Sequence, residues 1–503
     1  MSDQGSNGAA KAAPARYSSA YASAVVGLLL LAYTFNFIDR TIVATIGQAI
    51  KVDLKLTDTQ LGLLGGFSFA VLYTLGGIPI ARLAERYNRV SIIAVSLVVW
   101  SGFTAFCGAA QSFTQLLLLR VGVGVGEAGC SPPSHSLISD YFSPKARTTA
   151  LSVYSFGIPL GTMFGAIAGG WLAQSLGWRW AFVVVGLPGL LIALLVKLAI
   201  KEPPRGHSET LETPVLAEDV GAHAVEAPKG FWLWTELREL AAVSKALFLR
   251  WPVANMVAGV TIASFGSYGS GQFVPPLLAR AFHLDYATIG FIVGLITGFS
   301  AGIGTLLGGV LSDSLGKRHA RWYPLIPAIG LAIATPIYVF AYLQTDWKLV
   351  AAILLIPGIF HYTYLGPTFG VVQNSVDARR RATATALLFF VLNFIALGGG
   401  PFFTGWIIDH FAEFNFNHQG LDFLGSFNAM LAGGPAGAQH FAAACPGGKA
   451  PAGAAAAVKQ ACGGALVLST RQGVIVSILF YGWAAVHYLL AALSMGKNVR
   501  REG

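Results

Sequence analysis

Twelve apolar stretches of about 20 residues recur along the chain, and they constrain its fold more than any other feature. A helix of about 20 apolar residues is long enough to cross the hydrocarbon core of a bilayer. Backbone polar groups inside that core must pair within the protein, which favours helices for segments of this length. The sequence therefore predicts an all-α membrane protein with spans near residues 21–48, 60–80, 90–110, 115–138, 149–173, 180–200, 251–279, 288–311, 323–343, 349–372, 383–408 and 472–495.

The composition agrees with a membrane protein. Charged residues make up 11% of the chain, whereas soluble domains average about 25%. The net charge of +10 would suit nucleic acid, but the basic residues are spread over short loops, so we expect no nucleic-acid partner. The four cysteines lack metal-ligand spacing, so we predict no metal and no cofactor.

The basic residues of the short loops set the orientation. The loops after the second, fourth, eighth and tenth spans carry eleven Lys and Arg, and those after the first, third, fifth, seventh and ninth carry five. The positive-inside rule then places both termini in the cytoplasm. We expect a multi-pass monomer in the cell (inner) membrane. The predicted parts are a cytoplasmic tail (1–19), a six-helix bundle (20–200), a cytoplasmic linker (201–248), a second bundle (249–495) and a cytoplasmic tail (496–503).

An internal repeat relates the two bundles. Residues 61–89 align without a gap on residues 289–317, an offset of 228 that pairs Gly62 with Gly290. Parallel six-span repeats indicate a transporter whose site lies between the halves near the middle of the membrane.

Several motifs carry a family resemblance. "GGVLSDSLGKR" (308–318) is similar to the loop signature of the major facilitator superfamily, whereas "ARLAERYNRV" (81–90) departs from it at Ala81, Glu85 and Asn88. With "NFIDR", "RVGVGVGEAG", "GIPLG" and "EPPRG", the chain resembles the spinster branch over residues 20–410 and the last span. The resemblance implies alternating-access transport of lipid-like amphiphiles such as lysophospholipids or sphingosine-type phosphates.

The resemblance also implies a cytoplasmic gate at the two loop motifs. Its residues would be Glu85, Arg86, Arg89, Asp313, Lys317 and Arg318. Ordinary positive-inside charge explains the basic members of this set equally well.

Four charged residues lie inside the predicted spans of the first half. Charges buried in a membrane are costly and are functional candidates by default. Arg120 and Glu127 lie seven residues apart on nearly one helix face, while Asp39 and Arg40 are adjacent and point about 100° apart. We predict that Asp39 is shared between Arg40 and Arg120 and that Glu127 faces the central cavity. Asp39 and Glu127 are then the candidates for proton coupling; a static ion pair is the alternative.

Weaker candidates for the substrate cavity are polar and aromatic side chains in the spans. They are Tyr33, Asn36, Tyr268, Gln272, Asn393, Phe394 and His361. Interhelical hydrogen bonds or packing explain the first six about as well, and for His361 a hydrogen-bonded packing role is favoured over a second proton site. "GVGEAG" (124–129) matches a dinucleotide motif formally, but it lies inside an apolar helix, where close packing is the better explanation.

Two loops carry further predictions. Residues 203–228 are interpreted as a tether, and 232–247 as an amphipathic helix lying on the cytoplasmic leaflet or packing under the bundle. Residues 412–468 are predicted to be an external loop, within which residues 432–464 are too rich in Ala and Gly for a core. An oxidising compartment permits a disulfide between Cys445 and Cys462 there, with free thiols as the alternative.

The sequence thus favours a proton-coupled secondary transporter of a lipid-like or organic-anion substrate. A multidrug or organic-anion transporter of other specificity and a non-transporting sensor on the same fold remain alternatives. An enzyme is not expected, because no catalytic constellation is present: Ser134, His135 and Asp140 lie on one helix and cannot form a triad.

Overall fold

The computed structural model describes residues 17–205, 241, 243–245, 247–376, 381–433 and 440–498, apart from the side chains of residues 78, 81, 82, 85, 144, 145, 148, 381, 382 and 496–498. Within these residues every regular element is a helix. The first half contains α1 (Ser19–Thr45), α2 (Gly47–Asp53), α3 (Asp58–Gly65), α4 (Phe67–Arg86), α5 (Arg89–Cys107), α6 (Phe113–Glu127), α7 (Ser131–Tyr141), α8 (Pro144–Ser155), α9 (Gly157–Leu176) and α10 (Trp178–Ala199).

The second half is also helical. It contains α14 (Trp251–Phe282), α15 (Tyr286–Leu295), η2 (Ile296–Ser300), α16 (Ala301–Gly316), α17 (Trp322–Leu343), α18 (Trp347–His361), η3 (Tyr362–Tyr364), α19 (Leu365–Asn374), α20 (Arg381–Val391), η5 (Leu392–Gly398), α21 (Gly399–Asn417), α22 (Phe423–Leu431), α23 (Phe441–Ala444), η6 (Pro446–Gly448) and α24 (Ala456–Asn498).

Ten segments of the described chain are long and apolar enough to cross a membrane. They are Ser19–Thr45, Asp58–Gly77, Arg89–Cys107, Thr149–Leu176, Trp178–Ala199, Tyr286–Gly316, Trp322–Leu343, Trp347–Asn374, Thr383–Asn417 and Ala456–Met495. The other two predicted spans, near residues 115–138 and 251–279, fall on α6 with α7 and on α14. All twelve predicted spans therefore lie on helices.

The interruptions of the spans repeat between the halves. α6 runs for 15 residues and ends at Glu127, and α18 runs for 15 residues and ends at His361. Their starts, Phe113 and Trp347, and their ends both differ by 234 positions. Each helix is followed by a short irregular turn and then by a second helix, α7 or α19. Breaks in the middle of a span are typical of transporter sites.

Each half has its own hydrophobic core. One cluster of buried side chains runs from Ala22 to Ile200, and another from Val243 to Ala491. Only Leu397 in the first cluster and Leu61 in the second come from the opposite half. The described end of the predicted amphipathic helix contributes Val243 and Leu247, which are buried in the second cluster; residues 232–240, 242 and 246 lie outside the described residues.

The halves meet through helix pairs that the repeat relates to each other. A Cβ atom on Gly62 of α3 would lie 2.1 Å from the carbonyl oxygen of Pro401 in α21. A Cβ atom on Gly290 of α15 would lie 2.2 Å from the carbonyl oxygen of Ala166 in α9. The repeat pairs Gly62 with Gly290, and Ala166 and Pro401 are 235 positions apart. Glycine is needed at both places because the backbones touch.

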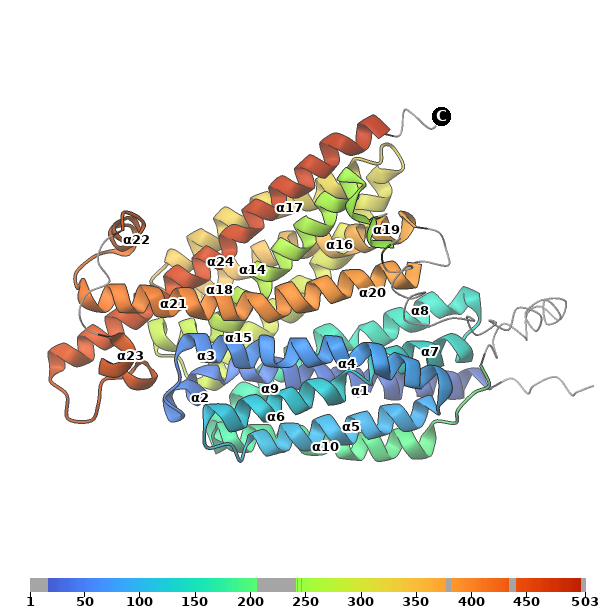
Figure 1. Cartoon of the computed structure of the whole chain (residues 1–503), viewed down its shortest axis with the longest axis horizontal. Coiled ribbons are helices and arrows are strands. Elements are labelled where there is room, and N and C mark those ends of the chain that lie inside the picture. The colour runs from blue at the N-terminus through green and yellow to red at the C-terminus, as the bar shows by residue number, and fades with distance from the viewer. Residues whose placement is uncertain are drawn as a thin grey trace, which may run out of the picture.

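Figure 1 shows the two halves as groups of helices that diverge toward one end. The end that carries α2, α22 and α23 is termed the cap end, and the end that carries the described chain ends near residues 17 and 498 is termed the terminal end. The tight glycine contacts hold the halves together toward the cap end, where α3 begins. Toward the terminal end, α24 and α17 lean away from the first half (Figure 1).

The segment between α21 and α24 forms the cap and corrects one sequence expectation. α21 continues to Asn417 and α24 begins at Ala456, so the loop is shorter than residues 412–468. Ala is the strongest helix former, and the Ala-rich stretch extends the last helix instead of leaving a loop. The expected lack of a core is also wrong, because the segment packs a small one of its own.

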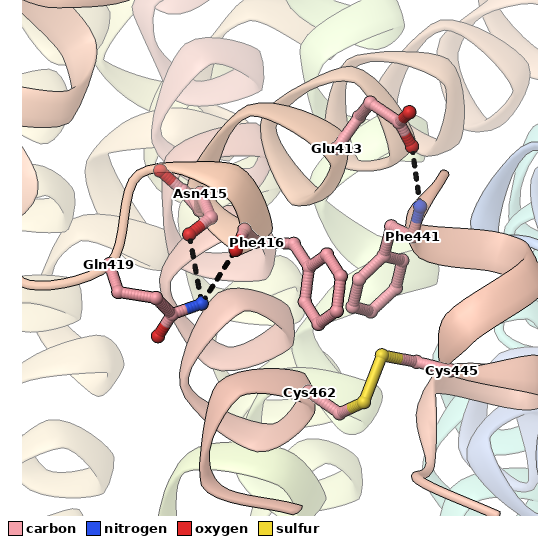
Figure 2. Close-up of a disulfide and its surroundings, with 7 residues drawn as sticks. All are labelled: Glu413, Asn415, Phe416, Gln419, Phe441, Cys445 and Cys462. Carbon is pink, nitrogen blue, oxygen red and sulfur yellow. Dashed lines mark hydrogen bonds between the residues drawn. A yellow bond between two sulfur atoms is a disulfide. The ribbon is translucent and has the colours of Figure 1, made fainter. Parts of the chain in front are cut away.

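A disulfide lies at the centre of that small core. Cys445 is bonded to Cys462, 17 residues later, and both are buried. Beside the disulfide, the rings of Phe416 and Phe441 meet edge to face at 5.7 Å (Figure 2). Glu413 accepts a 2.7 Å hydrogen bond from the backbone N–H of Phe441, which fixes α23 to α21 (Figure 2).

The cap also contacts the first half. A Cβ atom on Gly447 would lie 3.1 Å from the carbonyl oxygen of Lys51, and one on Gly448 would lie 3.4 Å from the Lys51 side chain. Both glycines have positive φ angles, 67° and 81°. Residues with a Cβ atom rarely adopt this backbone conformation. A segment of the second half thus rests on α2 of the first half.

Candidate functional site

The four charged residues predicted inside the spans of the first half form one largely buried cluster between α1 and α6. Arg40 Nε donates to Glu127 Oε2 at 2.7 Å, and the Glu127 side chain is fully buried while that of Arg40 is 18% exposed. The Arg40 guanidinium lies over three aromatic rings, Phe37, Phe69 and Tyr73, at 4.9, 4.6 and 4.6 Å. Such rings stabilise a desolvated cation. Arg40 is therefore held in place while part of it stays accessible.

Asp39 points to a different side of α1. Thr104 Oγ1 on α5 donates to Asp39 Oδ2 at 3.2 Å, and Arg120 Nη1 donates to the Asp39 backbone carbonyl at 3.4 Å. The prediction that Asp39 is shared between Arg40 and Arg120 is wrong for Arg40, which bonds to Glu127, whereas Arg120 lies near enough to Asp39 to interact with its carboxylate electrostatically. Successive helical residues point about 100° apart, so Arg40 turns to Glu127 while Asp39 turns to α5.

Several buried polar atoms in this cluster lack a hydrogen-bond partner in the described part of the chain. They are Asp39 Oδ1, Glu127 Oε1, Arg120 Nε and both amide atoms of Asn36. An unsatisfied buried polar atom costs about 1–3 kcal/mol. The cluster is thus set up to gain a partner, such as a proton or a ligand atom.

The remaining first-half candidate, Tyr33, packs against other aromatic rings. Its ring stacks on Tyr154 of α8 with 4.4 Å between the ring centroids and meets Phe37 edge to face at 5.2 Å.

The second-half candidates divide into exposed and buried side chains. Tyr268 of α14 and Phe394 of η5 are 42% and 41% exposed, whereas Asn393 is half-buried. Tyr268 lies near enough to Arg40 to interact with it electrostatically. Gln272 is buried against the other half, since a Cβ atom on Gly65 would lie 2.1 Å from its Oε1.

His361 lies apart from the charge cluster. It is 2% exposed and lines a cavity inside the second half, together with tyrosines from α17, η3 and α24. The structure therefore does not bring His361 together with Asp39 or Glu127.

The loop motifs lie at the terminal end and behave differently in the two halves. Asp313, Lys317 and Arg318 are exposed at and just beyond the end of α16, and Arg86 is exposed at the end of α4. The side chain of Glu85 lies outside the described residues. Asn88, one of the departures from the signature, caps α5 by accepting a 2.7 Å hydrogen bond from Ser91 N.

Arg89 is the buried member of the first motif. Its Nε donates to Glu202 Oε1 at 2.6 Å, its Nη1 donates to Asp140 and to Ser136, and its Nη2 donates to the Pro203 carbonyl at 3.0 Å. These bonds join α5, α7 and the chain after α10. Glu202 and Pro203 open the "EPPRG" motif at 202–206, which was therefore the sequence signal for this contact.

A second charge cluster crosses between the halves at the cap end, and sequence reasoning missed it. Arg280 Nη2 of α14 donates to Asp58 Oδ1 at 2.6 Å, and Lys51 Nζ donates to Asp58 Oδ2 at 2.6 Å. Arg280 also donates to Gln48 and Thr470, both at 2.7 Å. Burial lowers the pKa of Lys51 below its ordinary value, and the neighbouring Asp58 opposes that shift.

The same junction is capped from the second half. Asp409 of α21 accepts from the backbone N–H groups of Asp58 and Thr59 at 2.9 and 2.7 Å. A carboxylate at the positive N-terminal end of a helix is favourable. Asp58 and Arg280 are 222 positions apart, so only the fold reveals their pairing.

Comparisons with known proteins agree with this geometry. The family model of the Major Facilitator Superfamily matches residues 29–401. An MFS-type efflux pump of Mycolicibacterium smegmatis is 34% identical over 398 residues, covering 79% of this chain and 87% of the pump. Protein spinster of Drosophila melanogaster is 28% identical over 408 residues, covering 78% of this chain and 63% of that protein.

A solved structure is similar over nearly the whole chain. A bacterial homolog of the human lysosomal transporter spinster, in an inward-facing and unoccupied conformation, has a TM-score of 0.77 and 32% identity, covering 96% of this chain and 99% of that one. The predicted fold class and family are thus confirmed, and the expectation that the chain is not an enzyme holds. This chain is a multi-pass membrane transporter that belongs to the major facilitator superfamily and is similar to the spinster proteins.

Proposed function

We propose that the chain is a proton-coupled transporter that moves an amphipathic anion by alternating access, with Asp39 and Glu127 as the proton-coupling residues. The observation that carries this proposal is the buried cluster of two carboxylates and two guanidiniums. Each carboxylate keeps one buried oxygen without a hydrogen-bond partner. The first and second halves correspond to residues 20–200 and 249–495.

The charge balance of the cluster links protons to an anion. With both acids ionised, Asp39 and Glu127 balance Arg40 and Arg120. When one acid takes up a proton, the cluster gains a net positive charge, which attracts an anionic group. Buried charges interact strongly because the local dielectric constant is low, so a proton and an anion favour each other's binding.

The arrangement of the halves supports an inward-facing state. The cap end is closed by the glycine contacts and by the Asp58–Arg280 pair. With both termini in the cytoplasm of an inner-membrane protein, the cap end would be outside and the diverging terminal end inside. Outward opening would then require Arg280 to leave Asp58, and the loop motifs around Glu85 and Asp313 would close the inner side.

The surroundings of Arg40 fit an amphipathic substrate. Arg40 offers a partly exposed cation among three aromatic rings. Tyr268 adds an exposed ring from the other half. An anionic head at Arg40 and an apolar part along these rings would match a lysophospholipid or a sphingosine-type phosphate.

A second candidate is an efflux pump for drugs or organic anions. The 34% identity to an MFS-type efflux pump favours it. The same cation and aromatic rings would hold a planar organic anion, and the coupling chemistry would be unchanged.

Purified protein in liposomes tests the proposal. Flux of lysophosphatidic acid, sphingosine 1-phosphate and a fluorescent organic anion would be measured with and without an imposed pH gradient. We expect the gradient to accelerate flux of at least one anion by tenfold or more over empty liposomes. If the pH gradient does not change the flux, proton coupling is refuted. If none of the probes is transported, the proposed substrate class is refuted.

A further inference from the structure

The second half contains a cavity of its own, separate from the charge cluster. Its lining comes from α14, α15, η2, α17, α18, η3 and α24. About 80 Å³ of it is open to the centres of water molecules. At roughly 30 Å³ for each water, it has room for about two or three waters, or for a group of similar size.

The described lining of the cavity is mainly apolar and aromatic, with several hydroxyl groups and no charged side chain. Its described lining includes Tyr338, Tyr342, Tyr362 and Tyr481, together with Ser and Thr hydroxyls, and no Asp, Glu, Lys or Arg. An isolated charge would be strongly disfavoured there because nothing would neutralise it. The cavity thus suits an uncharged group that forms hydrogen bonds.

His361 is the group that needs a ligand. Its ring stacks on Tyr481 with 4.2 Å between the ring centroids, which fixes its position, and it is 2% exposed. Neither ring nitrogen has a hydrogen-bond partner in the described residues. A neutral imidazole has one donor and one acceptor. A hydroxyl group can satisfy either nitrogen, because it both donates and accepts.

The repeat places this cavity where the first half has its charges. His361 ends α18 as Glu127 ends α6, and both helices are 15 residues long. Ser267 of α14 lines the cavity, and the next residue, Tyr268, is the exposed ring near Arg40. Tyr362 also lines the cavity, with its ring centroid 4.5 Å from that of His361, and it lies near enough to Tyr268 to interact with it electrostatically. Tyr268 and Tyr362 thus lie between Arg40 and His361.

We propose that this cavity is a second subsite of the transport site, which binds the uncharged, hydroxyl-bearing part of the substrate through His361. The inference rests on the proposed transport function and adds to it. An anionic group binds at Arg40, while a glycerol-like hydroxyl binds His361 and its carbon atoms lie against the tyrosine rings. The substrate is accordingly a hydroxylated anionic amphiphile.

A pair of probes that differ by one hydroxyl tests the subsite. The probes are 1-oleoyl lysophosphatidic acid, which has a free hydroxyl on its glycerol, and the corresponding deoxy analogue. Dissociation constants would be measured with the full-length protein in nanodiscs. The wild type should bind the hydroxylated probe about tenfold more tightly, which is the effect of one neutral hydrogen bond.

The variants separate a binding role from a packing role. His361→Phe keeps the ring but should abolish the preference for the hydroxylated probe, and His361→Gln, which still donates and accepts, should restore part of it. Tyr364→Phe is the matched control. Tyr364 is buried, with its ring centroid 5.6 Å from that of His361, but its hydroxyl bonds to Ser264 and the residue does not line the cavity.

The outcomes distinguish the two proposals. If His361→Phe binds and transports with an unchanged preference, the subsite is refuted and the transport function stands. If the wild type binds both probes equally, the subsite is also refuted. If the wild type binds neither probe, the proposed substrate class fails and the subsite fails with it.

Discussion

Arg89 and Arg86 belong to one loop motif but differ in what they contact. Arg89 is buried and bonded to Glu202, Asp140 and Ser136, whereas Arg86 is exposed. Positive-inside charge explains an exposed arginine at this place, but not one that joins three chain segments. We therefore interpret Arg89 as a structural anchor of the first half.

Replacing each arginine in turn compares how much the two side chains contribute to the stability of the protein. Arg89→Ala removes the guanidinium that two carboxylates share, and breaking such a buried pair costs about 3 kcal/mol. Thermal unfolding in detergent should show a clear drop in Tm for Arg89→Ala and almost none for Arg86→Ala. Equal Tm values for the two variants would show that Arg89 is not an anchor.

At the scale of elements, the paired glycines control how closely helices of opposite halves approach. Gly62→Ala should push α3 away from α21, and Gly290→Ala should push α15 away from α9, because a Cβ atom has no room at either position. Gly77→Ala, in open space on α4, is the control. Distances between spin labels at the cap end should lengthen in the first two variants only. Unchanged distances in both would contradict the close contact.

The disulfide should stabilise the cap rather than the whole bundle. A bond that closes a loop of this length contributes roughly 3 kcal/mol in the chain-entropy model. Cys445→Ser with Cys462→Ser should therefore speed hydrogen exchange in residues 441–455 and leave α5 and α17 unchanged. Adding reductant should have the same effect on the wild type and none on the double variant. Unaltered exchange in the cap would contradict the stabilising role.

For the whole molecule, the sequence predicted the architecture better than the site. Long apolar stretches and the 228-residue offset are sufficient for twelve spans in two related halves, because bilayer thickness fixes helix length. The sequence also located Asp39, Arg40, Arg120 and Glu127, which lie together in one cluster, but it did not predict that other charged residues of the first half, such as Lys51, Asp58 and Arg89, are buried.

The pairings could not be predicted in the same way. Whether Arg40 turns to Asp39 or to Glu127 depends on helix rotation and on the rings that hold the guanidinium. The Asp58–Arg280 pair joins residues 222 positions apart, at loop ends that looked like ordinary surface charge. The cavity around His361 depends on tyrosines from three separate helices, which no local pattern connects.

In the proposed mechanism of the whole molecule, a buried carboxylate exchanges a proton as the halves move. The most direct test compares wild type with Asp39→Asn/Glu127→Gln in liposomes, measuring pH-driven substrate accumulation and substrate exchange without a gradient. Asp53→Asn, an acid in an exposed pair with Arg179, is the matched control and should behave as the wild type. We predict that the double variant loses pH-driven accumulation but keeps exchange. Accumulation at the wild-type rate in the double variant would contradict this mechanism.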